Sequence, residues 1–172
     1  MSRIQQAFQE KKAFIPFITC GDPDLETTEK LVYAMEEAGA SLIELGIPFS
    51  DPTAEGPVIQ EASLRALSGG VTTDKILDMV KRIRQKSQIP LVFMTYANVV
   101  FSYGIGRFVK RMKETGMDGL ILPDVPFEEK EEFDSVCREY GIELISLIAP
   151  TSHERIRMIA EKASGFVYCV SS

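Results

Sequence analysis

Two carboxyl groups stand in one segment of the sequence where they could carry out acid–base chemistry. Glu44 interrupts the apolar run 42–45, and Glu55 lies in the proline-rich loop that follows. Burial among apolar side chains disfavours the charged form of a carboxyl group and so raises its pKa. A carboxyl group with a raised pKa can exchange protons near neutral pH. Two structural alternatives stay open: Glu44 could pair with a Lys or Arg on a covering helix, and Glu55 could be a solvent-exposed loop residue.

The elements that must position these acids follow a repeating pattern of short apolar runs and amphipathic stretches. The predicted strands are 14–19, 41–45, 90–95, 119–122, 142–148 and 165–170, and the predicted helices are 25–38, 58–67, 73–86, 105–115, 128–140 and 152–163. Repeated strand–helix units with wholly apolar strands indicate an α/β fold with a parallel sheet covered by helices. The turn TCGDPD after the first run lacks the G-x-G-x-x-G pattern of an open dinucleotide-binding sheet, so a barrel is favoured.

In such a barrel the functional side chains project from the carboxyl ends of the strands. Strand alternation puts Leu42, Glu44 and Gly46 on one face. If this face points inward, Glu44 stands at the mouth of the barrel, and the prolines of the following loop hold Glu55 on a stiffened arm. Asp22 and Asp124 also follow predicted strands, where either could instead be a helix cap or a turn former.

The length of the chain bears on how much of a barrel it forms. A complete (β/α)8 TIM barrel takes about 250 residues, whereas this chain has 172 and shows six units. The sequence therefore predicts a single, incomplete TIM-barrel domain over residues 1–172, with only the first six β/α units. Six units leave two open strand edges, which a monomer should not tolerate. We expect the missing part to be absent, cleaved off or carried separately.

Composition argues against several other classes of protein. The net charge is −6, which disfavours a nucleic-acid or anionic-membrane surface. No apolar stretch is long enough to span a membrane, and the N-terminus lacks the apolar region of a signal peptide. Three cysteines, Cys20, Cys137 and Cys169, are far apart and odd in number, so no disulfide is indicated and a reduced cytoplasm is expected. No lysine stands at a predicted strand end for a Schiff base, and no cluster of Cys and His has the spacing of a metal site.

Four segments of the chain resemble the α subunit family of tryptophan synthase. They are FIPFITCGDPD, IELGIPFSDPTAEGPVIQEASLRAL, MTYANVVFSYG and LPDVPFEE, in the order of the family and across the whole chain. The resemblance implies a TIM-barrel lyase of tryptophan biosynthesis. Its reaction is the retro-aldol cleavage of indole-3-glycerol phosphate to indole and glyceraldehyde 3-phosphate.

The resemblance also implies roles for individual residues. Glu44 matches the proton shuttle that protonates C3 of the indole ring and helps remove the proton of the glycerol hydroxyl. Glu55 matches the loop acid that holds the indole N–H, a position where many members carry the shorter aspartate. The residues that match the indole pocket are Phe17, Met94, Ile121, Ile148 and Tyr168, and those that match its supporting groups are Thr19, Tyr96 and Asp124. Plain core packing is the competing interpretation for the pocket residues.

A partner is implied in the same way. The family works as an αββα complex with a β subunit that carries pyridoxal phosphate and receives indole through an internal tunnel. The residues that match the partner interface are Pro48, Asp51, Pro52 and Asn98. The α subunit itself needs neither a metal nor an organic cofactor.

The end of the chain departs from the family pattern. A mobile phosphate-binding loop should begin at Ser171 and Ser172, and further phosphate ligands should follow the last two strands. We therefore expect a polypeptide that ends at Ser172 to be inactive alone and prone to associate through its edges. Two other functions compete with the lyase: a non-catalytic fragment or homologue that only docks on a β-type partner, and another phosphosugar barrel such as an isomerase. The absence of an isomerase-like His/Glu pair favours the lyase over the latter.

Overall fold

The computed structural model describes residues 1–9, 12–151 and 153–171 and has parallel strands in two sheets. The first sheet has the order β1 (Phe17–Thr19), β2 (Ile43–Gly46), β3 (Leu91–Met94), β4 (Gly119–Ile121) and β5 (Glu143–Leu144). The second sheet pairs β6 (Ser146–Ile148) with β7 (Val167–Cys169). Within each sheet, every strand pairs with its neighbour in the sequence, as expected of repeated β/α units.

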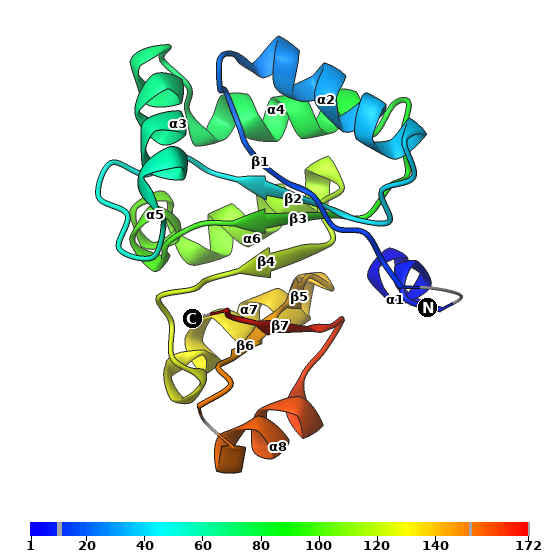
Figure 1. Cartoon of the computed structure of the whole chain (residues 1–172), viewed down its shortest axis with the longest axis vertical. Coiled ribbons are helices and arrows are strands. Elements are labelled where there is room, and N and C mark those ends of the chain that lie inside the picture. Colours follow the sequence, from blue (N-terminus) through cyan, green and yellow to red (C-terminus); the bar gives the residue numbers. More distant parts are fainter. Residues whose placement is uncertain (10–11, 152, 172) are drawn as a thin grey trace.

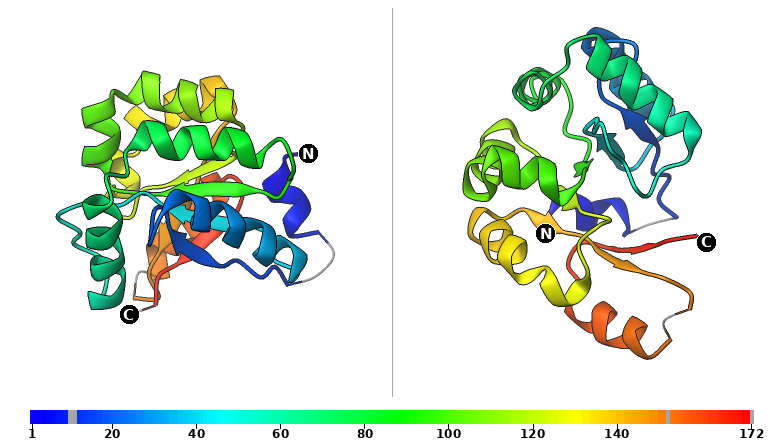
Figure 2. Two further views of the ribbon diagram at one scale, coloured as in Figure 1. Left: turned by 90° about the horizontal axis from the view of Figure 1, so that it is seen from above. Right: turned by 90° about the vertical axis from the view of Figure 1, so that its left-hand side faces the viewer.

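The helices lie round the outside of this curved set of strands, as Figures 1 and 2 show, except for the N-terminal helix on the inner side. They are α1 (Arg3–Ala7), α2 (Leu25–Glu37), α3 (Pro57–Ser68), α4 (Thr73–Ile83), α5 (Ala97–Tyr103), α6 (Ile105–Thr115), α7 (Glu131–Tyr140) and α8 (His153–Lys162), with a 3-10 turn η1 (Phe127–Glu129) before α7. The predicted α/β class with a helix-covered parallel sheet is confirmed.

Both faces of the sheet are apolar, which explains why the strands are continuous apolar runs in the sequence. Leu45, Phe93 and Leu120 face outward and pack in the large core beneath the helices. The inner face carries a smaller core formed by Leu42, Val92, Ile121, Ile145 and, from α1, Ile4. Glu44 is in register with Val92 and therefore belongs to the inner face.

The structure differs from the predicted elements at three places. The predicted strand 142–148 is divided at Ile145, so that β5 pairs with β4 whereas β6 pairs with β7. Helix α5 was not predicted, because it is short and its first backbone N–H is capped from a distant loop. Helix α1 was not predicted either, although Ser2 and Gln5 form a capping box that is visible in the sequence. Ser152, the first residue of the last predicted helix, lies outside the described residues.

Candidate active site

Glu44 is a nearly buried acid on the inner face of β2. It lies between Phe17 of β1 and Val92 of β3 in the strand register, and only 6% of its surface is exposed. Burial raises the pKa of the Glu44 carboxyl group to about 7. Among residues 1–9, 12–151 and 153–171, no basic group lies within ion-pair distance of it. The structural alternative, in which Glu44 pairs with a base on a covering helix, is therefore not what the structure shows.

Four of the predicted pocket residues share this face with Glu44. Met94 and Ile121 are in register with each other and with Gly46 at the carboxyl ends of their strands. Phe17 leans over Gly46, where an added Cβ would lie 2.5 Å from the aromatic ring. Tyr168 packs against the inner core, and its pKa is raised first by burial and then by the negative charge of Glu44. An apolar and aromatic surface thus surrounds the acid.

Ile148, the fifth predicted pocket residue, is not brought to this face. It is in register with Cys169, whereas Leu147 is in register with Tyr168 and packs with the inner core. Because neighbouring residues of a strand point to opposite faces, Leu147 takes the inner position and Ile148 faces the helices. Ile145 and Leu147 are two residues apart, which places both side chains on one face of a strand. This spacing is the signal in the sequence that could have identified Leu147 as the inner residue.

Glu55 is held in place by the hydroxyl group of Tyr96. This hydroxyl donates a hydrogen bond to the Glu55 carboxylate and accepts the backbone N–H groups of Ala54, at 2.9 Å, and Thr53, at 3.2 Å. Tyr96 is 4% exposed, and its pKa is raised by burial and then by the bond to Glu55. The side-chain amide of Gln60 donates to the Glu55 carbonyl oxygen at 2.8 Å. The loop is therefore anchored to the end of β3 through one tyrosine.

A small cavity joins the loop acid to the strand ends. Its lining includes Phe17, Thr19, Glu55, Met94 and Tyr96, at the carboxyl ends of β1, β2 and β3. Thr19 is in register with Gly46 and so stands on the inner face as well. The structure thus gathers Glu55 with the predicted pocket and supporting residues of these strands at one end of the sheet. Glu44 does not line this cavity and lies two residues before Gly46 on the inner face of β2.

Two aspartates that follow strands have positional roles. Both carboxylate oxygens of Asp124 accept the backbone N–H of Ala97, at 3.0 and 3.2 Å, at the start of α5. Asp124 therefore fixes the helix that begins directly after Tyr96. Asp22 pairs with Arg65 of α3 through two bonds of 2.9 Å. Arg65 is the first cause of the lowered pKa of Asp22.

The residues expected at a partner interface differ in their exposure. Asp51 and Asn98 are exposed, and Pro52 is half-buried. Pro48 is buried within the chain, and its place in the interface stays a prediction. The sequence marks Pro48 as a loop residue, but it directly follows β2 and shares the burial of that strand.

Neither a metal-binding cluster nor a membrane-spanning helix is present in the described part of the chain. Its residues contain no group of three or more His, Cys, Asp or Glu side chains arranged to hold a metal ion. No helix among them is both long and apolar enough to cross a membrane.

Comparison with known proteins gives consistent matches. The family model described as Tryptophan synthase alpha chain matches residues 4–172. The tryptophan synthase alpha chain of Alkaliphilus metalliredigens is 52% identical over 177 residues, which cover 100% of this chain and 66% of the relative. That of Caldanaerobacter subterraneus is 54% identical, over 99% of this chain and 67% of the relative. The chain thus spans about two thirds of the length of these relatives.

Solved structures give the same match. The tryptophan synthase subunit alpha of Legionella pneumophila superposes with a TM-score of 0.94 and is 40% identical, over 99% of this chain and 68% of that chain. A chain of the tryptophan synthase complex of Pyrococcus furiosus has a TM-score of 0.88 and 41% identity, over 92% of this chain and 66% of that chain.

Proposed function

Because the chain belongs to the tryptophan synthase alpha chain family, we propose that it is the part of a carbon–carbon lyase that carries the proton-transferring acids. The reaction is the cleavage of indole-3-glycerol phosphate to indole and glyceraldehyde 3-phosphate in tryptophan biosynthesis. The observation that carries this proposal is Glu44: a buried carboxyl group with a pKa of about 7, on an apolar face, with no basic partner among the described residues.

Glu44 moves the protons of the reaction. A carboxyl group with a pKa near 7 is present in both protonation states at neutral pH, so it can both give and take a proton. In its protonated form it donates to C3 of the indole ring. In its ionised form it accepts the proton of the glycerol hydroxyl as the bond between C3 and the side chain breaks. The electron pair of that bond returns to the ring, and the hydroxyl carbon becomes the aldehyde of glyceraldehyde 3-phosphate.

Glu55 stabilises the ring while it carries positive charge. Protonation at C3 places positive charge on the ring nitrogen, and a carboxylate held near that nitrogen lowers the energy of this intermediate. Tyr96 and the backbone of the loop restrict the position of the acid, which is the preorganisation that such stabilisation needs. The apolar walls around Phe17, Met94 and Ile121 suit the indole ring.

The fold and the partner complete the proposal. The parallel strands with helices on their outside correspond to six of the eight units of a TIM barrel, formed by a single domain over residues 1–172. The partner is a β subunit that carries pyridoxal phosphate, and this chain has no cofactor of its own. Relatives from Pyrococcus furiosus are described as a tryptophan synthase a2b2 complex, and Asp51 and Asn98 are exposed at the site end of the sheet. A cytoplasmic location belongs to the same proposal.

The substitution Glu44→Gln in the full-length protein tests the catalytic assignment. Loss of the proton-transferring group should lower kcat for cleavage of indole-3-glycerol phosphate by at least ~10²-fold. Glu61→Gln on the exposed side of α3 is the matched control and should leave kcat unchanged. Unchanged activity of Glu44→Gln would refute the assignment. A protein that binds the β subunit without cleaving the substrate would support the docking-only alternative.

A further inference from the structure

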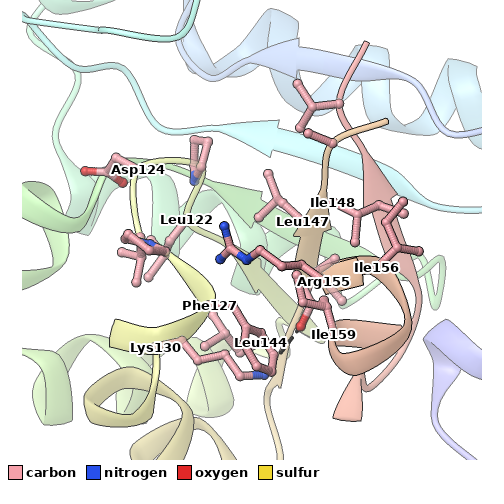
Figure 3. A pocket seen from close by; sticks show the side chains of 17 residues that line it. Leu122, Asp124, Phe127, Lys130, Leu144, Leu147, Ile148, Arg155, Ile156 and Ile159 are labelled. Atoms are coloured by element: carbon pink, nitrogen blue, oxygen red, sulfur yellow. Dashed lines mark hydrogen bonds between the residues drawn. The ribbon is translucent and has the colours of Figure 1, made fainter. Parts of the chain in front are cut away.

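A second cavity lies outside the proposed active site, between the sheet and the helices. Its volume is about 280 Å³, and it is enclosed by β5, β6, the loop after β4 and α8 (Figure 3). The apolar walls are formed by Leu122, Phe127, Leu144, Ile148, Ile156 and Ile159. Leu144 and Ile148 alternate with Ile145 and Leu147, which also line the cavity but pack with the inner core. Glu44 is not among the lining residues.

Lys130 provides the one charge of this cavity that has no acidic partner among the described residues. Its ammonium nitrogen lies 4.6 Å from the centre of the Phe127 ring and 3.4 Å from the hydroxyl oxygen of Ser146. The other charged lining groups are already engaged. Arg155 donates to both carboxylate oxygens of Glu128 at 2.7 Å, and Asp124 accepts the backbone N–H at the start of α5.

Ser146 adds a second polar group at the same end of the cavity. The residue is 5% exposed, and its hydroxyl oxygen accepts from Lys130. The hydroxyl proton has no acceptor within residues 1–9, 12–151 and 153–171. The hydroxyl oxygen is thus satisfied by Lys130, while the hydroxyl proton remains available to a further acceptor. Two donor groups, the Lys130 ammonium and the Ser146 hydroxyl, thus lie together at one end of the cavity, and no acidic group among the described residues pairs with them.

We propose that this cavity binds a small organic acid with an apolar body. The carboxylate accepts hydrogen bonds from the Lys130 ammonium group and the Ser146 hydroxyl group, and the apolar body contacts Ile148, Ile156 and Ile159. A carboxylate fits because it has two acceptor oxygens and one charge, matching the two donors and the one unpaired cation. The volume is at the lower end of the roughly 300–1,000 Å³ of ligand pockets, which suits an acid with a single ring.

Binding of phenylacetate and of its neutral analogue phenylacetamide tests the proposal. The two molecules have nearly the same shape and differ in charge. With isoleucine methyl groups labelled for NMR, phenylacetate should shift the signals of Ile148, Ile156 and Ile159. The signal of Ile121, on the inner face, should stay in place. Phenylacetamide should bind at least ~10-fold more weakly, because a charge-assisted hydrogen bond is lost.

Three variants separate the proposed anchor from a general effect of charge. Lys130→Gln should bring the affinity for phenylacetate down to that for phenylacetamide, and Ser146→Ala should weaken phenylacetate binding in the same direction. Lys162→Gln, at an exposed position of α8, should change neither affinity. Equal binding of the acid and the amide to the unsubstituted protein would overturn the proposal. So would shifts confined to the inner face, or no shift at ~10 mM phenylacetate, a concentration above the millimolar Kd of weak ligands.

Discussion

At the scale of single residues, the burial of Glu44 has a consequence for stability that can be measured without substrate. Its pKa is raised from 4.5 to about 7, so the folded state holds this proton more tightly than the unfolded chain does. The stabilisation that Glu44 adds to the free energy of unfolding is therefore fully present below pH 4.5 and is lost as the pH rises through 7. The size of the loss is roughly 3 kcal/mol, from about 1.4 kcal/mol per pKa unit.

Urea denaturation between pH 4 and pH 8 gives the free energy of unfolding of the unsubstituted protein and of Glu44→Gln. The difference between the two values isolates the effect of the Glu44 carboxyl group. We expect the difference to fall by roughly 3 kcal/mol across this range, because glutamine does not titrate. A difference that stays constant with pH would show that Glu44 ionises normally, and the proton-shuttle role would then lose its physical basis.

A second residue-scale prediction concerns Tyr96. In the full-length protein, Tyr96→Phe removes the donor to Glu55 and the acceptor of the loop N–H groups of Thr53 and Ala54, so the acid is no longer fixed. We expect kcat for indole-3-glycerol phosphate to fall about 10-fold, or about 1.4 kcal/mol, near the worth of one hydrogen bond to a charged group. The matched control is Tyr33→Phe, which removes a 3.0 Å bond to Glu29 on the far side of the sheet. Equal kcat values for the two variants would contradict the role of Tyr96.

At the scale of elements, α5 depends on a residue from another loop. Asp124 supplies the acceptor for its first N–H, at 3.0 Å, because the residue before the helix makes no side-chain cap. Asp124→Ala should therefore lower the free energy of unfolding by about 1 kcal/mol. It should also speed amide exchange at the start of α5. Asp24→Ala at the N-cap of α2 is the control, with faster exchange confined to α2. Unchanged exchange in α5 would refute the capping role.

The same element shows what could be predicted from sequence and what could not. The strands and long helices were predictable, because their apolar periodicity reports burial on one face or both. Helix α5 was missed because a helix of seven residues gains its cap from a long-range contact that no local pattern records. The division at Ile145 was missed for a similar reason, since pairing with β4 or with β7 is decided by neighbouring strands.

The candidate site was predictable to a different extent. Glu44 was identifiable as a charged residue inside an apolar run, and the structure places it on the inner face as expected. The choice of Ile148 followed motif position rather than strand alternation, and the structure brings Leu147 to that face instead. The role of Tyr96 as the anchor of the loop depends on hydrogen bonds between segments far apart in the sequence, so no spacing predicted it.

At the scale of the whole molecule, Asp118 joins three parts of the chain at the end of the sheet away from the site. Its carboxylate accepts from Arg84 at 2.8 Å, from Arg3 of α1 at 2.9 Å and from the backbone N–H of Leu91 at 2.9 Å. The side chains of Asp118 and Arg84 are only 11% and 10% exposed. Burial lowers the pKa of Arg84 to about 10, while the charge of Asp118 acts in the opposite direction.

Removal of this carboxylate should destabilise the molecule as a whole. We expect Asp118→Ala to lower the free energy of unfolding by about 3 kcal/mol, because it leaves Arg84 buried without its partner. The control is Glu26→Ala, which breaks the exposed pair with Lys30 and should cost at most about 0.5 kcal/mol. Equal losses in urea denaturation would show that the buried network contributes no more than a surface pair.

The contact between Phe17 and Gly46 limits how the binding surface for the ring can vary. The aromatic ring occupies the space that any side chain at position 46 would need, although the two residues belong to different strands. The dimensions of this surface are therefore a joint property of both positions. A larger residue at 46 requires the Phe17 ring to move aside or a smaller residue to replace it, so we expect a change at either position to alter the shape of the ring that the surface accepts.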